Sequence, residues 1–190
     1  MSVTRPVSPT TAISWRYRLQ QFWRGLHAEV TADEIQRAVA LLPGPAGNLF
    51  CAMPVDAQRH SLNVLASLGR AGQSNADLAA AALLHDVGKI AAQRAGYPLG
   101  LWWRGPLVLL EALAPQLLPG LACADPASGW RYVVYVQLNH PAIGATWADE
   151  AGCSWLTCWL IAHHQEQTPP NTDPARLALL QALQWADGKN

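Results

Sequence analysis

The chain has 190 residues, of which 51% are hydrophobic, and its formal net charge is zero at pH 7. This length and composition suit one ordinary domain with a real core. The chain contains no dense cluster of Lys and Arg and no apolar run near the ~18 residues of a membrane span, so we expect neither a nucleic-acid partner nor a membrane partner.

The N-terminal region is expected to be an extension over residues 1–48. Residues 1–13 are polar and read as loosely ordered, without the long apolar core of a signal peptide. Residues 15–27 alternate apolar and arginine positions, which favours an amphipathic helix docked on the main domain, with a membrane-surface helix as the alternative. Thr31 to Glu34 form a capping box that opens a helix ending before Pro43, and residues 44–47 are expected to form a turn.

The rest of the chain reads as helical almost throughout, because Ala and Leu dominate and no alternating run typical of a strand is seen. Ser74 or Asn75 caps the helix that carries His85, and Gly88 is expected to end it. Pro141 suits the first turn of a new helix. The predicted helical segments are 54–68, 75–88, 97–118 with a break at 105–106, 130–138, a helix opening at 141, 154–164 and 175–185.

Four cysteines are scattered along the chain without a C-x-x-C pair. This usage favours free thiols in a reducing compartment, so we expect a cytoplasmic protein. They are Cys51, Cys123, Cys153 and Cys158.

The most informative stretch is His85-Asp86, which follows the uncharged run 79–84. Such a run should be buried, and two ionisable groups at its end are costly unless something pairs with them. A divalent metal ion would satisfy both. Adjacent helical residues point about 100° apart, so the two side chains flank an ion, and the two oxygens of Asp86 can bridge a pair of ions.

Other candidate ligands lie at or near the ends of different predicted helices, and a helical bundle can bring such positions together. Imidazole and carboxylate together suit one or two divalent ions of Fe, Mn, Co, Ni or Zn better than Ca²⁺. Lys89 lies four residues after His85, on the same side of the helix, and is expected to reach either a substrate phosphate or a carboxylate beside the metal ligands. The further candidate ligands are His60, His140, His163, His164 and Asp187.

The pattern resembles the HD-domain superfamily of metal-dependent phosphohydrolases over residues 54–187. Its H…HD…D signature matches His60, His85-Asp86 and Asp187. His140 and the 163–164 pair resemble the added histidines of two-metal members, among them the bacterial diadenosine tetraphosphate hydrolases and the HD-GYP cyclic dinucleotide phosphodiesterases. The chain lacks the DGxGYP stretch and the HDxxED pattern of particular branches, so the substrate stays unnamed.

The resemblance implies an all-α HD helical bundle over residues 49–190 and hydrolysis of a nucleotide or other small phosphate ester by a metal-activated hydroxide. Asp86 and Lys89 would be catalytic, and by similarity His163 is preferred to His164 as a ligand. Two alternatives stay open: a non-catalytic module that senses a nucleotide or binds a partner, and a di-iron oxygenase on the same fold. The oligomeric state is also open.

Overall fold

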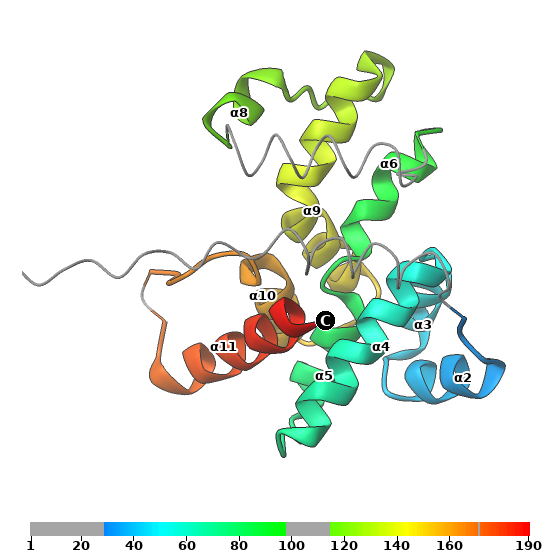
Figure 1. Ribbon diagram of the computed structural model, residues 1–190, viewed down its shortest axis with the longest axis vertical. Coiled ribbons are helices and arrows are strands. Elements are labelled where there is room, and N and C mark those ends of the chain that lie inside the picture. Colours follow the sequence, from blue (N-terminus) through cyan, green and yellow to red (C-terminus); the bar gives the residue numbers. More distant parts are fainter. Residues whose placement is uncertain (1–28, 98–114, 171) are drawn as a thin grey trace, which may run out of the picture.

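The computed structural model describes residues 29–97, 115–170 and 172–190, and every regular element within them is a helix (Figure 1). The predicted all-α class is therefore confirmed. The predictions for residues 1–13, for the helix 15–27 and for most of 97–118 lie outside the described residues. The elements are α2 (Ala32–Ala40), α3 (Gly44–Cys51), α4 (Val55–Arg70), α5 (Ala76–Leu84), η1 (Val87–Lys89), α6 (Ile90–Arg94), η2 (Pro115–Leu117), α8 (Leu118–Leu121), η3 (Pro126–Ser128), α9 (Trp130–Glu150), α10 (Trp155–His163) and α11 (Pro174–Lys189).

Side-chain caps fix the beginnings of several helices. Thr31 and Glu34 form the predicted capping box at the start of α2. Asn75 accepts a hydrogen bond from the backbone of Leu78 and so begins α5, and Ser154 caps α10 in the same way. Each cap satisfies a backbone N–H group that the first turn of a helix leaves without an intrahelical partner.

Two predicted boundaries are wrong at the chain's periphery. Residues 44–47, expected to be a turn, begin α3, because Pro45 is accommodated in the first turn of a helix and Ala46 is buried against the core. The last helix, expected over residues 175–185 with a stop at Gly188, continues to Lys189, so Asp187 and Gly188 are both helical residues.

Two further boundaries, both beside the predicted metal ligands, are also wrong. Helix α5 ends at Leu84 rather than Gly88, and His85 is its C-cap residue. Gly88 instead lies within the short 3₁₀ turn η1, which leads directly into α6. Pro141 does not open a new helix, because α9 runs without interruption for 21 residues and contains it.

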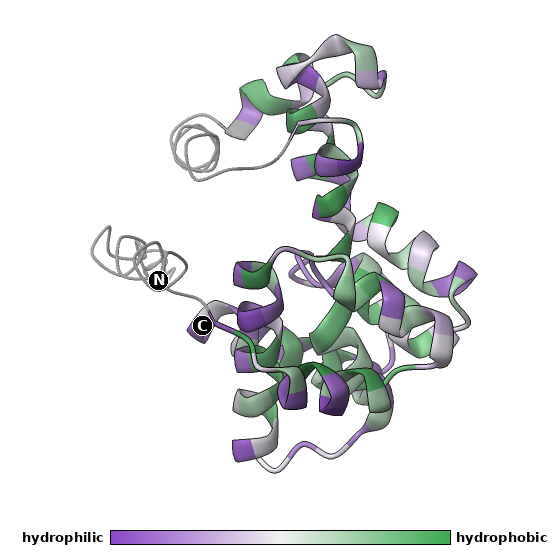
Figure 2. Cartoon of the chain, turned by 90° about the vertical axis from the view of Figure 1, so that its right-hand side faces the viewer, coloured by the Kyte–Doolittle hydropathy of each residue, from purple (hydrophilic) through white to green (hydrophobic). Residues whose placement is uncertain are grey.

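The main core lies where α4, α5, α10 and α11 meet, in the lower body of Figure 1, where much of the ribbon has the green of hydrophobic residues in Figure 2. Helix α5 is central, because every residue from Ala80 to Leu84 is buried. Ala38 of α2 and Phe50 of α3 belong to the same core. The predicted boundary between residues 48 and 49 thus falls inside α3, and side chains on both sides of it pack into one core.

A second, smaller core joins α6, α8 and the first half of α9, which extend away from the main body (Figure 1). Val133, Val134 and Val136 of α9 are its buried centre. The second half of α9 packs against η1 and α10. Helix α9 therefore connects the two cores, and His140 lies close to the point where it passes from one to the other. Within the described residues, no helix is long and apolar enough to cross a bilayer.

Candidate metal centre

Five helical segments deliver histidine and aspartate side chains to one point in the main body. His60 comes from the middle of α4, His140 from the middle of α9 and Asp187 from the last turn of α11. His85 and His164 are the C-cap residues of α5 and α10. Asp86 follows His85 directly and precedes η1. Because the chain leaves its helices at His85 and His164, these rings sit where helix ends converge.

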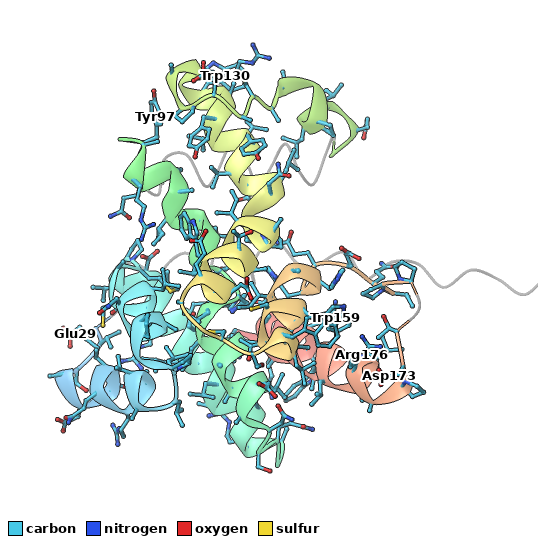
Figure 3. All side chains as sticks on the ribbon, turned by 180° about the vertical axis from the view of Figure 1, so that it is seen from behind. Glu29, Tyr97, Trp130, Trp159, Asp173 and Arg176 are labelled. Carbon is cyan, nitrogen blue, oxygen red and sulfur yellow. The ribbon has the colours of Figure 1, made fainter. Side chains whose placement is uncertain are left out.

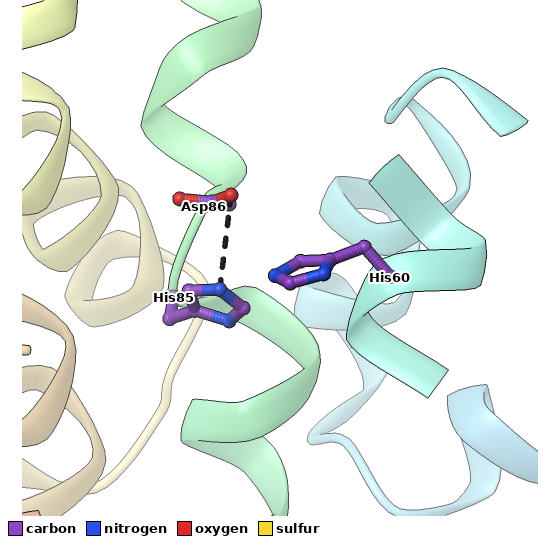
Figure 4. A group of neighbouring side chains, drawn as sticks. All are labelled: His60, His85 and Asp86. Carbon is purple, nitrogen blue, oxygen red and sulfur yellow. Dashed lines mark ion pairs between the residues drawn. The ribbon is translucent and has the colours of Figure 1, made fainter. Parts of the chain in front are cut away.

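The first group with metal-binding geometry consists of His60, His85 and Asp86 (Figure 4). One ligand atom from each lies within 4.8 Å of the other two. His85 Nε2 is 3.7 Å from Asp86 Oδ2, the pair joined by the dashed line in Figure 4, and the His60 ring points toward them from α4. These distances leave room for an ion between the three side chains.

The second group consists of Asp86, His140 and His164, again with ligand atoms within 4.8 Å of one another. Asp86 Oδ1 lies 3.3 Å from His140 Nε2 and 3.8 Å from His164 Nε2. Asp86 is therefore common to both groups, and its two carboxylate oxygens face different sets of histidines. This is the arrangement in which one carboxylate bridges two ions.

Asp187 completes the first group from the C-terminal helix. Its Oδ1 forms a 2.9 Å hydrogen bond with His60 Nε2 and lies 3.5 Å from His85 Nε2. Although burial opposes this, the hydrogen bond with His60 and the nearby His85 hold the pKa of Asp187 well below its usual range. The carboxylate is thus ionised and directed at the same point as His60 and His85.

Two buried imidazole nitrogens at the centre lack a hydrogen-bond partner among the described residues. They are Nε2 of His85 and Nε2 of His164. In each ring the other nitrogen, Nδ1, is engaged by a backbone carbonyl, at 3.1 Å from Ala82 and at 2.8 Å from Ile161. A buried polar atom without a partner is costly, and a neutral imidazole nitrogen is the commonest protein ligand of a transition metal. The lone pairs present here are therefore those that a metal ion requires.

The negative charge of Asp86 is compensated by the ammonium group of Lys89. The Lys89 ammonium lies 2.7 Å from Oδ1 and 2.8 Å from Oδ2. Burial would raise the pKa of Asp86, but Lys89 and His85 outweigh burial and hold that pKa well below its usual range. The Lys89 ammonium therefore supplies part of the positive charge that a metal ion would otherwise bring to Asp86.

Two of the histidines have shifted pKa values of opposite sign. Burial, with the neighbouring His85, lowers the pKa of His164 to about 3, which keeps its ring neutral and able to coordinate. Burial also acts to lower the pKa of His85, but Asp86 and Asp187 outweigh it and raise that pKa. The carboxylates of Asp86 and Asp187 thus favour a positive charge beside them.

Side-chain exposure increases from His85 and His140 toward Lys89 and Asp187. The side chains of His85 and His140 are 0% exposed, whereas those of Lys89 and Asp187 are 31% and 34% exposed. These two imidazoles are fully buried, whereas the Lys89 ammonium and the Asp187 carboxylate lie closer to solvent. A small anionic molecule would meet Lys89 before it met the buried histidines.

Gly88 lets η1 approach α9 closely enough to form the second group. A Cβ atom at residue 88 would lie 2.1 Å from the His140 carbonyl oxygen and 2.8 Å from the Gly144 backbone nitrogen. No side chain fits there, since backbone atoms cannot move aside as a flexible side chain can. The glycine after His85-Asp86 thus sets the spacing between Asp86 and His140.

Not every predicted ligand reaches the centre. His163 Nδ1 lies 2.9 Å from Glu166 Oε1, and its ring packs on that of Trp159, with the two ring centroids 4.8 Å apart. Trp159 also faces Arg176 of α11, and the two are labelled next to each other in Figure 3. The geometry therefore favours His164 over His163, the reverse of the preference drawn from sequence.

One residue at the centre was not identified from the sequence. The side-chain amide nitrogen of Gln165 lies 3.3 Å from His140 Nε2. A glutamine after a His-His pair carries no recognisable signal, because its proximity to His140 depends on how α10 ends beside α9. Gln165 is exposed, so it lies at the rim of the second group.

Comparison of the chain with family models, with curated proteins and with solved structures gives no match. The centre itself is a cluster of mostly buried histidine and aspartate side chains that could hold metal ions.

Proposed function

We propose that this protein is a metal-dependent phosphohydrolase that acts on a nucleotide or another small phosphate ester. The observation that carries the proposal is the pair of ligand groups sharing Asp86, each with a buried histidine whose Nε2 has no hydrogen-bond partner among the described residues. The order of His60, His85-Asp86 and Asp187 along the chain, which resembles the HD-domain signature, supports the same reading.

The donor set fits divalent transition ions. Each group combines imidazole nitrogen with carboxylate oxygen, which suits Fe, Mn, Co, Ni or Zn. His60, His85, Asp86 and Asp187 would hold one ion, and Asp86, His140 and His164 the other. When bound, such ions supply Lewis acidity toward a phosphoryl oxygen and make hydroxide available near neutral pH.

The chain's own residues would then orient and stabilise a phosphate ester. Lys89 is the partly exposed cation beside Asp86, and its ammonium offers donors to the phosphoryl oxygens on which negative charge develops. Gln165 offers an amide at the rim beside His140. Because His85, His140 and His164 are buried and Lys89 is partly exposed, a substrate phosphate would approach from the side of Lys89.

The first experiment measures metal content. We expect the purified full chain to bind two equivalents of Mn²⁺, Co²⁺ or Zn²⁺ per protein in a titration. Asp86→Asn should lose both, because Asp86 belongs to both groups, and His164→Ala should lose one. His163→Ala is the matched control, since it removes the adjacent histidine that lies outside the cluster, and it should still bind two.

The second experiment measures hydrolysis by the metal-loaded protein across a panel of phosphomonoesters, phosphodiesters and nucleotides. We expect turnover that Asp86→Asn abolishes and His163→Ala retains. A folded protein that binds two ions but hydrolyses nothing on the panel would overturn the hydrolase proposal and favour a nucleotide-sensing module. Oxygen consumption by the reduced iron form would instead favour the oxygenase alternative.

A further inference from the structure

Three buried histidines of the metal centre each form the same type of local hydrogen bond. In each, Nδ1 faces the backbone carbonyl three residues earlier: Ala82 for His85, Gln137 for His140 and Ile161 for His164. A carbonyl oxygen only accepts, so each Nδ1 carries a hydrogen, and in the neutral ring Nε2 is then the lone-pair nitrogen. The backbone thus selects the tautomer that coordinates through Nε2.

For two of these rings the carbonyl is available because a helix ends. Helix α5 ends at Leu84 and α10 ends at His163, so the carbonyls of Ala82 and Ile161 lie in last turns. Carbonyls in the last turn of a helix have no intrahelical donor. The histidine at the C-cap position takes that role.

His140 is different, because it lies ten residues from either end of α9. In an uninterrupted helix the Gln137 carbonyl would accept the backbone N–H of residue 141, four positions later. Residue 141 is proline, which has no backbone N–H, and its ring displaces the carbonyl four residues before it. The Gln137 carbonyl is thereby free for His140 Nδ1, which lies 2.7 Å from it.

We propose that Pro141 is a positioning residue, which frees the Gln137 carbonyl so that His140 is held as the Nδ1–H tautomer with Nε2 directed at Asp86. Pro141 recreates, in the middle of a long helix, the unpaired carbonyl that helix ends provide for His85 and His164. The inference rests on the proposed metal site for its purpose, but the tautomer itself is a property of the metal-free chain. It also explains why a residue unfavourable to helix interiors stands directly after a candidate ligand.

The test compares Pro141→Ala with a chain that carries lactic acid, the ester counterpart of alanine, at residue 141. Alanine restores the backbone N–H, which competes with His140 for the Gln137 carbonyl, whereas the ester has no N–H. Pro174→Ala is the matched control, because Pro174 occupies the first turn of α11, where an N–H has no intrahelical acceptor. Circular dichroism checks that each full-length variant keeps its helix content.

The first readout is the tautomer of His140 in the metal-free protein, from ¹⁵N-histidine NMR at about pH 8, above the ordinary histidine pKa. We expect Nδ1–H in the wild type, in the lactic acid chain and in Pro174→Ala, and a mixture containing Nε2–H in Pro141→Ala. His164 should be unchanged in all four and is the internal reference. An unchanged His140 tautomer in Pro141→Ala would overturn the inference.

The second readout is Co²⁺ titration. Loss of a group that orients a metal-binding histidine typically weakens affinity about 10- to 100-fold, so we expect that loss at one ion in Pro141→Ala and wild-type affinity at the other. The lactic acid chain should regain wild-type affinity; if it does not, ring shape rather than the missing N–H is responsible and the inference fails. A wild type that binds no metal would refute the proposed function, while the tautomer would still decide the role of Pro141.

Discussion

At the scale of single residues, Asp86 is the most connected group of the centre. Its carboxylate faces Lys89 at one side and His85, His140 and His164 at the other. A carboxylate in this position would be unfavourable alone, and Lys89 offsets its charge. A metal ion bound at the proposed site would compete with Lys89 for the same two oxygens, so removal of Lys89 should change metal affinity in a predictable direction.

Replacing Lys89 with Met should raise metal affinity and lower turnover. The ammonium no longer competes for Asp86, a gain that we put at about 5- to 10-fold because Lys89 is partly solvated. Loss of a cation beside the phosphoryl group should lower turnover about 100-fold. Metal titration and steady-state kinetics separate the two effects, and Lys89→Arg, which keeps the charge, is the control. A joint fall of affinity and turnover would show instead that Lys89 mainly maintains the position of Asp86.

At the scale of elements, the centre depends on how closely η1 packs on α9. The backbone around Gly88 touches the backbone of α9 at His140 and Gly144, so the ligand on one element and the ligand on the other have a fixed separation. The C-terminal half of α9 also packs along α10, which places His140 beside His164, with ring centroids 5.2 Å apart. Small residues at this crossing are what permit two ligand groups to share one aspartate.

Gly88→Ala should therefore damage both stability and metal binding. The added Cβ would meet backbone atoms of α9, and such overpacking costs about 1–3 kcal/mol of unfolding free energy. Gly69→Ala is the control, because a Cβ at residue 69 meets nothing within 4 Å and alanine favours a helix interior. Urea unfolding and metal titration should show losses for Gly88→Ala and none for Gly69→Ala. Equal stability of Gly88→Ala and wild type would contradict the close approach.

A second pair of elements is joined by a charge contact beside the centre. Arg59, the neighbour of His60 on α4, pairs with Glu34 of α2 at 2.7 Å and also donates to the Glu29 carbonyl. The hydrogen bond with Arg59 is the main cause that lowers the pKa of Glu34 from 4.5 to about 2. This contact holds α2 against the helix that carries His60.

The Glu34–Arg59 pair predicts a pH dependence of stability with a definite sign. A carboxyl whose pKa is lowered on folding stabilises the protein above its unfolded pKa, and this stabilisation is lost as the pH falls through the folded pKa. The unfolding free energy of wild type minus that of Glu34→Gln should thus be constant above about pH 4.5 and shrink toward pH 2. Urea titrations of both proteins across this range give the difference, and a difference independent of pH would refute it.

At the scale of the whole molecule, the centre joins segments far apart in the sequence. His60 and Asp187 are separated by 127 positions and form a hydrogen bond. Helix α11 packs on α4 and α5, so the C-terminal segment closes the core and delivers Asp187 together. Two ions held there would together link α4, α5, α9, α10 and α11, and each would bind the folded chain far better than the unfolded one.

Metal should accordingly stabilise the whole fold. At a free concentration about 100 times Kd, one ion adds about 2.7 kcal/mol, which raises Tm by about 5–11 °C for a chain of this size. Calorimetry before and after chelation measures the shift. Asp86→Asn should show no metal-dependent shift, and an identical shift in that variant would place the bound ion elsewhere.

The sequence by itself determined the helical class, several helix caps and the chemical identity of most of the centre. Thr31 and Ser154 were identified as caps, and Asn75 as one of two candidates beside Ser74, because these side chains bond backbone groups only three residues away, which is local information. His85-Asp86 was recognisable because two ionisable groups at the end of an uncharged run require a partner.

Only the tertiary structure decided which residues meet. The choice of His164 over His163 depends on the direction in which α10 ends beside α9, and the contact of Gln165 with His140 depends on the same crossing. Pro141 looked like the start of a helix because local rules place proline there, yet packing on both sides carries α9 through it. The residue types in the sequence indicate which side chains could coordinate a metal. Which of these side chains meet depends on helix contacts between residues far apart in the chain.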